Sequence, residues 1–185
     1  MEADKFDDRF RIASARWAGY DYSQSGMYFV TICTQNRARH FGEIILPTGD
    51  WDGAELYPTR QAQLAEVCWL QIPARFPFAT LDAFVVMPDH IHGLLLFDKP
   101  GEQVPALNYQ NNFGPQRDNL AAVIRGFKAG VSALAKQEGL QFSWQSRYHD
   151  RVVRNDAELC KIQQYIAANP ARWKHEQFTE EGLFR

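Results

Sequence analysis

The chain has 185 residues and a net charge of −2, with 45% hydrophobic and 14% aromatic residues. This length and composition can bury one substantial core, which favours a single domain over residues 1–185. No apolar run approaches the ~18 residues of a membrane span, and the first residues lack the pattern of a secretion signal, so we expect a cytoplasmic protein without membrane contact. The three cysteines form no C-x-x-C pair, so the sequence indicates neither a zinc knuckle nor a disulfide framework.

The first half of the chain predicts strands around one helix. Residues 27–34 are rich in β-branched and aromatic residues and predict a strand, and residues 41–46 predict a second, short one. Apolar residues at helical spacing begin after Thr59, a suitable N-cap, and we expect Pro73 to end that helix. Two further strands should follow, separated by a turn at Pro88–Asp89.

The second half begins with a segment of low periodicity. Residues 98–116 are rich in Pro, Gly, Gln and Asn, which predicts a long exposed loop. Beyond this loop, apolar residues recur at helical spacing, so residues 118–138 should form one amphipathic helix.

The chain ends with a predicted strand and helix. Residues 142–154 predict the strand, and Asn155 should cap the helix with Glu158 in the reciprocal position of a capping box. We expect this helix to run to about Ala168 and to stop before Pro170.

Two histidines on one predicted strand are the most informative motif. Side chains alternate along a strand, so His90 and His92 should project from the same face, while Ile91 points into the core. Unbroken apolar runs on both sides of the pair indicate a strand that is covered on both faces. Buried imidazoles must be hydrogen-bonded or bind a ligand. The pair is therefore either a set of hydrogen-bonded core histidines or half of a metal site.

A second group of polar residues lies on the last predicted helix. Tyr165 and Asn169 are four residues apart and face the same way. Taken singly, Tyr165 is well explained as an aromatic residue that packs the helix on the sheet, and Asn169 as a cap at the end of the helix. Together with His90 and His92, however, Asn169 would complete a donor set of two nitrogens and one amide oxygen, which suits Mg²⁺ or Mn²⁺ and also admits Zn²⁺.

Positive charge is concentrated in one segment. Residues 117–154 contain seven Lys and Arg against three Asp and Glu, whereas the chain as a whole is slightly acidic. Such a segment attracts polyanions, although a solvated helix face has the same composition. The candidate DNA-binding residues are Arg125, Lys128, Arg147, Arg151 and Arg154.

The ordered motifs resemble a known family. Residues 85–94 resemble the HUH motif of the single-tyrosine transposases, and residues 155–159 with 165–170 resemble the nucleophile helix of the REP-associated tyrosine transposases. The similarity extends over about residues 17–173. It implies an α/β (α+β) domain of ferredoxin-like or RRM-like type, with helices packed on an antiparallel sheet, both histidines on a central strand and the nucleophile on the C-terminal helix.

The resemblance also implies an activity. A homodimer would act on single-stranded DNA with hairpins, through a divalent metal and a tyrosine that forms a 5′-phosphotyrosyl link and frees a 3′-OH. Tyr165 maps to the nucleophile, and His90, His92 and Asn169 map to the metal ligands. Such a protein would be cytoplasmic and associated with the nucleoid when bound to DNA.

Two positions depart from relatives in insertion sequences, which often have Gln as the third ligand and Asn before the first histidine. Asn169 keeps the amide oxygen at a shorter reach. Asp89 could orient His90 or simply cap the turn, and we expect the turn.

Three functions remain open at this stage. The first is a DNA transposase or nickase with Tyr165 as the nucleophile, and the second is a DNA-binding module of the same fold without catalysis. The third is a zinc hydrolase, which needs another ligand, with His149 and Asp89 as candidates. Tyr148 is an alternative nucleophile, but its neighbour His149 should point to the opposite face of a strand.

Overall fold

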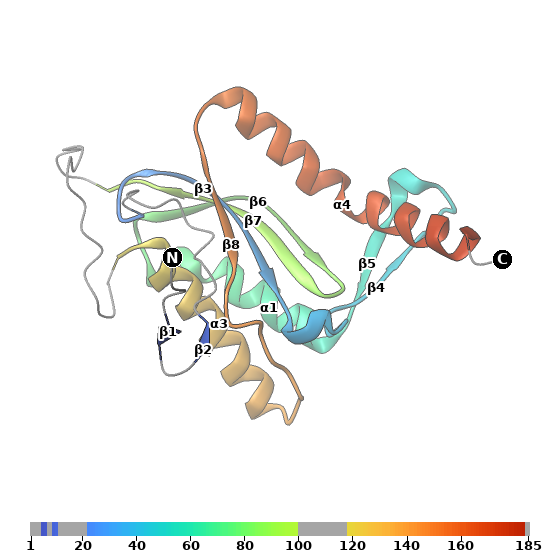
Figure 1. Cartoon of the computed structure of the whole chain (residues 1–185), viewed down its shortest axis with the longest axis horizontal. Coiled ribbons are helices and arrows are strands. Elements are labelled where there is room, and N and C mark those ends of the chain that lie inside the picture. The colour runs from blue at the N-terminus through green and yellow to red at the C-terminus, as the bar shows by residue number, and fades with distance from the viewer. Residues whose placement is uncertain (1–4, 7–8, 11–21, 100–117, 184–185) are drawn as a thin grey trace.

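The computed structural model describes residues 5–6, 9–10, 22–99 and 118–183 (Figure 1). The loop that we predicted at 98–116 lies almost wholly outside the described residues, as do the first residues of the similarity to the family. No helix in these ranges combines the length and apolar composition that a membrane span requires.

A four-stranded antiparallel sheet forms the centre of the fold, in the order β6-β7-β3-β8. Its strands are β3 (Gly26–Cys33), β6 (Ala79–Met87), β7 (His90–Phe97) and β8 (His149–Val153). Helix α1 (Arg60–Leu70) precedes β6, and helix α3 (Leu120–Gln137) precedes β8. This βαββαβ order is that of a ferredoxin-like domain, so the predicted fold class is confirmed.

Smaller elements surround this core. A two-stranded hairpin is inserted between β3 and α1. The small elements are β1 (Lys5–Phe6), β2 (Arg9–Phe10), η1 (Gln35–Arg37), β4 (Gly42–Ile45), η2 (Trp51–Gly53), β5 (Glu55–Pro58) and α2 (Ile72–Arg75).

The helix starts follow the capping rules. Thr59 accepts a hydrogen bond from the backbone N–H of Ala62, as predicted for α1, and the amide oxygen of Asn119 accepts one from Ala122 at the start of α3. Each cap satisfies an N–H group that the helix itself leaves without a partner. The strand predicted at 142–154 is shorter than expected, because only β8 and an isolated bridge between Thr34 and Trp144 pair with the sheet.

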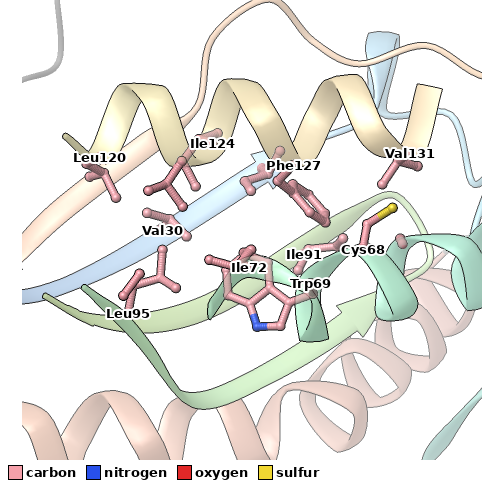
Figure 2. Close-up of a cluster of buried hydrophobic side chains, with 14 of the residues drawn as sticks. Val30, Cys68, Trp69, Ile72, Ile91, Leu95, Leu120, Ile124, Phe127 and Val131 are labelled. Atoms are coloured by element: carbon pink, nitrogen blue, oxygen red, sulfur yellow. The ribbon is translucent and has the colours of Figure 1, made fainter. Parts of the chain in front are cut away.

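The main hydrophobic core lies between the sheet and the helices α1 and α3. In Figure 2, Leu120, Ile124, Phe127 and Val131 of α3 point toward the side chains of α1 and the sheet. The indole of Trp69 lies directly against the backbone of Gly93, where an added Cβ would be 2.2 Å from the ring. Gly93 is therefore needed for close packing, at the position that follows His92.

The opposite face of the sheet is covered by helix α4 (Asp156–Leu183), which runs from β8 toward the β4–β5 hairpin (Figure 1). A second, smaller hydrophobic cluster holds it there. This α4 cluster consists of Leu94, Val153, Ile162 and Ile166.

The start of α4 only partly matches its predicted capping box. The amide oxygen of Asn155 accepts a hydrogen bond from the backbone N–H of Glu158 at 2.9 Å, as expected. The Glu158 carboxylate, however, accepts from the N–H of Arg154 rather than from that of Asn155. It also forms an ion pair with Arg151.

The prediction that this helix stops before Pro170 is wrong. Proline removes one helical hydrogen bond and bends a helix, but it does not end one that is held on both sides. Beyond Pro170, Trp173 contacts His90, and His175 contacts Trp51 of the hairpin. These tertiary contacts carry the helix past the proline.

Candidate active site

The histidine pair has the predicted arrangement. His90 and His92 lie on one face of β7, and their Nε2 atoms are 3.0 Å apart. Ile91 points to the other face and is fully buried in the main core. Both histidines are about 95% buried, with exposures of 4% and 5%.

The other ring nitrogen of each histidine is anchored. The Nδ1 atom of His90 is 2.6 Å from Oδ1 of Asp89, and Nδ1 of His92 is 2.8 Å from the hydroxyl of Thr31, its partner on β3. The expectation that Asp89 only caps the turn is therefore wrong, because its side chain binds His90. Both rings present Nε2 toward the same point.

The His92 ring is able to act as a neutral ligand. Burial, together with the nearby His90 and Arg37, lowers the pKa of His92 from 6.5 to about 3. His92 is thus neutral at physiological pH, and no proton competes for its lone pair. Phe29 stacks on the His92 ring and covers it on one side.

Tyr165 and Asn169 share one face of α4, as the spacing predicts, and the helix brings both to the pocket of the histidines. The Tyr165 hydroxyl is 3.2 Å from Nε2 of His92, and the edge of its ring meets Phe29. Asn169 is 7% exposed, and its side-chain amide has no hydrogen-bond partner among the described residues. The Asn169 amide lines the same pocket as both histidines, so it belongs to the set of donors that face this space.

These side chains line a pocket of about 210 Å³. It is lined by Thr31, Arg37, His90, His92, Tyr165, Asn169, Arg172, Trp173 and Glu176. The guanidinium of Arg172 lies over the Tyr165 ring, 5.4 Å from its centroid. Arg37 pairs with Asp89 at 3.0 Å. The pocket thus combines a phenol, two imidazoles, an amide, two cations and the carboxylate of Glu176.

Sequence reasoning missed these two cations. It placed the positive charge at residues 117–154, whereas Arg37 belongs to η1 and Arg172 to the part of α4 beyond Pro170. The backbone of Arg37 is unusual, with a φ of 55° that long side chains rarely adopt. This conformation marks the position in the structure, but it cannot be read from the sequence.

The five predicted DNA-binding residues do not line the pocket. Arg125 and Lys128 lie on α3, across the sheet from the histidines. The Lys128 ammonium donates to the carbonyls of Gln145 (2.7 Å) and Arg147 (3.1 Å), so it fastens the segment before β8. Arg151 is exposed on the histidine side of the sheet. The DNA-binding assignment of the five residues stays a prediction.

The structure gives the two alternative chemistries little support. Within the described ranges, no group of three His, Cys, Asp or Glu residues could hold a metal, which a zinc hydrolase would need. His149 is exposed on β8, and Asp89 is engaged with the far side of the His90 ring. Tyr148 packs against the main core, on the face of the sheet opposite the histidines.

Comparisons with known proteins identify relatives of this chain. No family model matches the chain. An uncharacterized protein of Haemophilus influenzae Rd is 31% identical over 170 residues, which cover 89% of this chain and 91% of that protein. A second protein of the same strain, with the provisional name REP-associated tyrosine transposase, is 26% identical over 163 residues, which cover 82% and 74%.

A solved structure that is similar to this chain carries the same description as the second relative. It shows a REP-associated tyrosine transposase bound to a REP hairpin, and it matches with a TM-score of 0.57 at 20% identity, covering 87% of this chain and 74% of that one. The chain is therefore similar to a REP-associated tyrosine transposase in sequence and in fold. The resemblance seen in the sequence is thus confirmed, together with the antiparallel fold that the resemblance implied.

Proposed function

We propose that this chain is a transposase that cleaves and rejoins single-stranded, hairpin-containing DNA through a 5′-phosphotyrosine intermediate, with Mg²⁺ or Mn²⁺ as cofactor. The observation that carries the proposal is the approach of the Tyr165 hydroxyl to within 3.2 Å of His92 Nε2, in a pocket that Asn169 also lines. The related transposase bound to a REP hairpin supports DNA as the partner.

The residues of the pocket fit a divalent ion. His90 and His92 present two Nε2 atoms to one point, and each Nδ1 is held by another side chain. Asn169 would add an amide oxygen, and such a mixed set leaves positions open for phosphate and water. When bound, the ion would act as a Lewis acid on the scissile phosphate.

The protein side chains would carry out the remaining chemistry. The Tyr165 oxygen attacks phosphorus and loses its proton, the phosphorus–O3′ bond breaks, and the released 3′ oxygen takes up a proton. Arg172, whose guanidinium lies over the tyrosine ring, adds a positive charge to the pocket that would attract the DNA phosphate. In the reverse direction a 3′-OH attacks the phosphotyrosine, so strands are rejoined without an external energy source.

The assay is incubation with a single-stranded hairpin oligonucleotide and Mn²⁺, followed by a denaturing gel for a covalent adduct. Tyr165→Phe should abolish the adduct and keep DNA binding, because it removes only the attacking oxygen. Tyr148→Phe is the matched control and should form the adduct normally. An adduct from Tyr165→Phe, or activity in the presence of a chelator, would overturn the proposal.

The same assay separates enzyme from binding module. DNA binding by the wild-type chain with no adduct under any metal would favour the catalytically silent module. The family resemblance further leads us to propose a homodimer in the cytoplasm, associated with the nucleoid when DNA is bound. Light scattering with and without the hairpin tests the dimer, and imaging of a tagged chain tests the location.

A further inference from the structure

Asp89 is a buried carboxylate that lies between a cation and one of the histidines. We infer that Asp89, held by Arg37, is a positioning residue that fixes His90 with its Nε2 lone pair facing the pocket. This inference rests on the proposed function, because it assigns a task to His90 in that site.

Both carboxylate oxygens of Asp89 are engaged. Oδ1 lies 2.6 Å from Nδ1 of His90, and Oδ2 lies 3.0 Å from Nε of Arg37, with only 7% of the Asp89 side chain exposed. An ionised carboxylate only accepts hydrogen bonds, so Nδ1 of His90 must carry the proton. In the neutral ring, Nε2 then holds the lone pair, and it is the atom that faces His92.

The turn that carries Asp89 is held rigidly by its backbone. The carbonyl of Asp89 accepts a hydrogen bond from the N–H of Thr34 at 2.9 Å, and the fully buried Thr34 places its hydroxyl between this carbonyl (2.9 Å) and that of Ala38 (2.7 Å). The neighbouring carbonyl of Pro88 accepts from the N–H of Phe41 at 3.0 Å. The carboxylate therefore starts from a fixed backbone position, which is what a positioning group requires.

The segment that holds this turn also supplies Arg37. Its φ of 55° is a sparsely populated conformation for a long side chain, and such strain persists only where the surroundings impose it. Here Arg37 donates to Sγ of Cys33 at 3.0 Å in addition to its ion pair with Asp89. The strained turn thus delivers the guanidinium to the far oxygen of the carboxylate.

The second histidine is anchored differently. The hydroxyl of Thr31 can donate to Nδ1 of His92 or accept from it, so it is compatible with either tautomer. Asp89 is compatible with only one tautomer of His90. The two histidines are therefore not equivalent, and loss of the carboxylate should act directly on His90 and reach His92 only through the contact between their Nε2 atoms.

The first measurement uses the metal-free protein. Nitrogen-15 NMR of the imidazoles should show His90 of the wild-type chain protonated at Nδ1 and unprotonated at Nε2. Asp89→Ala should give a mixture of the two tautomers at His90, whereas Asp89→Asn should keep the native one, because its amide oxygen still accepts from Nδ1. Asp98→Ala, which removes an exposed carboxylate at the other end of β7, is the control and should change neither ring.

The second measurement is Mn²⁺ affinity by titration calorimetry on the same chains. Asp89→Ala should weaken it about 10- to 100-fold, the range observed when partners of metal-bound histidines are lost, with a smaller loss for Asp89→Asn and none for Asp98→Ala. Thermal unfolding of each variant shows whether it is folded.

The outcomes separate the two proposals. Wild-type His90 protonated at Nε2 would overturn the inference, even if Asp89→Ala failed to fold. Equal Mn²⁺ affinity in the wild type and in folded Asp89→Ala would also overturn it. Failure of the wild type to bind any divalent ion, with the expected His90 tautomer, would instead overturn the proposed function and leave the orienting contact established.

Discussion

A single methyl group added at Gly93 tests how tightly the main core is packed beneath the site. In Gly93→Ala the new Cβ would lie 2.2 Å from Cζ2 and 2.5 Å from Cη2 of Trp69. Ordinary carbon contacts are about 3.5–4.0 Å, so the indole would have to move by more than about 1 Å. Trp69 is fully buried between Phe84 and Phe127 and has no free space in which to move.

The expected cost follows from two opposing terms. Overpacking of a filled core costs about 1–3 kcal/mol, and the overlap here places Gly93→Ala at the upper end of that range. Alanine also has less conformational freedom than glycine in the unfolded chain, which stabilises the folded state by about 0.5–1 kcal/mol. We expect a net loss of about 2 kcal/mol in the free energy of unfolding, measured by urea denaturation.

A double-mutant cycle identifies the cause. In a Trp69→Leu background the overlapping ring atoms are gone, so Gly93→Ala should become neutral or slightly stabilising, with a coupling of at least about 1 kcal/mol. Gly130→Ala on α3 is the control, since its Cβ would be 3.3 Å from Sγ of Cys68 and helix propensity favours the change. An equal loss from Gly93→Ala in both backgrounds would refute the reasoning.

Three further predictions concern pH, capping and charge. The unfolded chain binds a proton at His92 below pH 6.5, whereas the folded chain binds it only near pH 3, so the free energy of unfolding should fall as the pH falls. From pH 7.5 to 5 the expected drop in the metal-free protein is about 2 kcal/mol, measured by denaturation. His92→Gln should show no such drop. Asn155→Ala should lower the free energy of unfolding by about 1 kcal/mol, because it removes the oxygen that accepts from the N–H of Glu158. Asn155→Asp keeps such an oxygen and should cost almost nothing. Equal losses in the two variants would argue that Asn155 does not cap α4. Lys128→Met should lose about 1–3 kcal/mol of stability, because two carbonyls lose their donor. Arg125→Gln on the exposed side of α3 should, if Arg125 contacts DNA, reduce the salt slope of binding by about 0.7. An unchanged salt slope in Arg125→Gln, or unchanged stability in Lys128→Met, would contradict these roles.

Local periodicity explains which parts of this fold are visible in the sequence. The same-face geometry of His90 and His92 depends only on the alternation of a strand, and α3 depends only on apolar residues at helical spacing. The position of Tyr165 and Asn169 on one face of a helix is equally local. These predictions are confirmed because neighbours in the chain decide them.

The predictions that are wrong depend on contacts between distant segments. Pro170 marks a helix end by local rules, but contacts of Trp173 and His175 with other elements extend α4 beyond it. Arg37 and Arg172 reach one pocket from distant parts of the chain, so counting charge along the sequence could not place them together. The role of Asp89 could have been suspected from its place next to His90, but the ion pair that holds it was not visible.

The small size of the α4 cluster has a consequence for how the site comes apart. The histidines sit on an inner strand whose other face belongs to the main core, whereas Tyr165 and Asn169 depend on a helix held by few buried aliphatic side chains. Segments with little buried apolar surface open locally at a lower free energy than the whole domain unfolds. We therefore expect Tyr165 to separate from the histidines by local opening of α4 while the sheet remains intact, and the amides of α4 to exchange with solvent before those of β7.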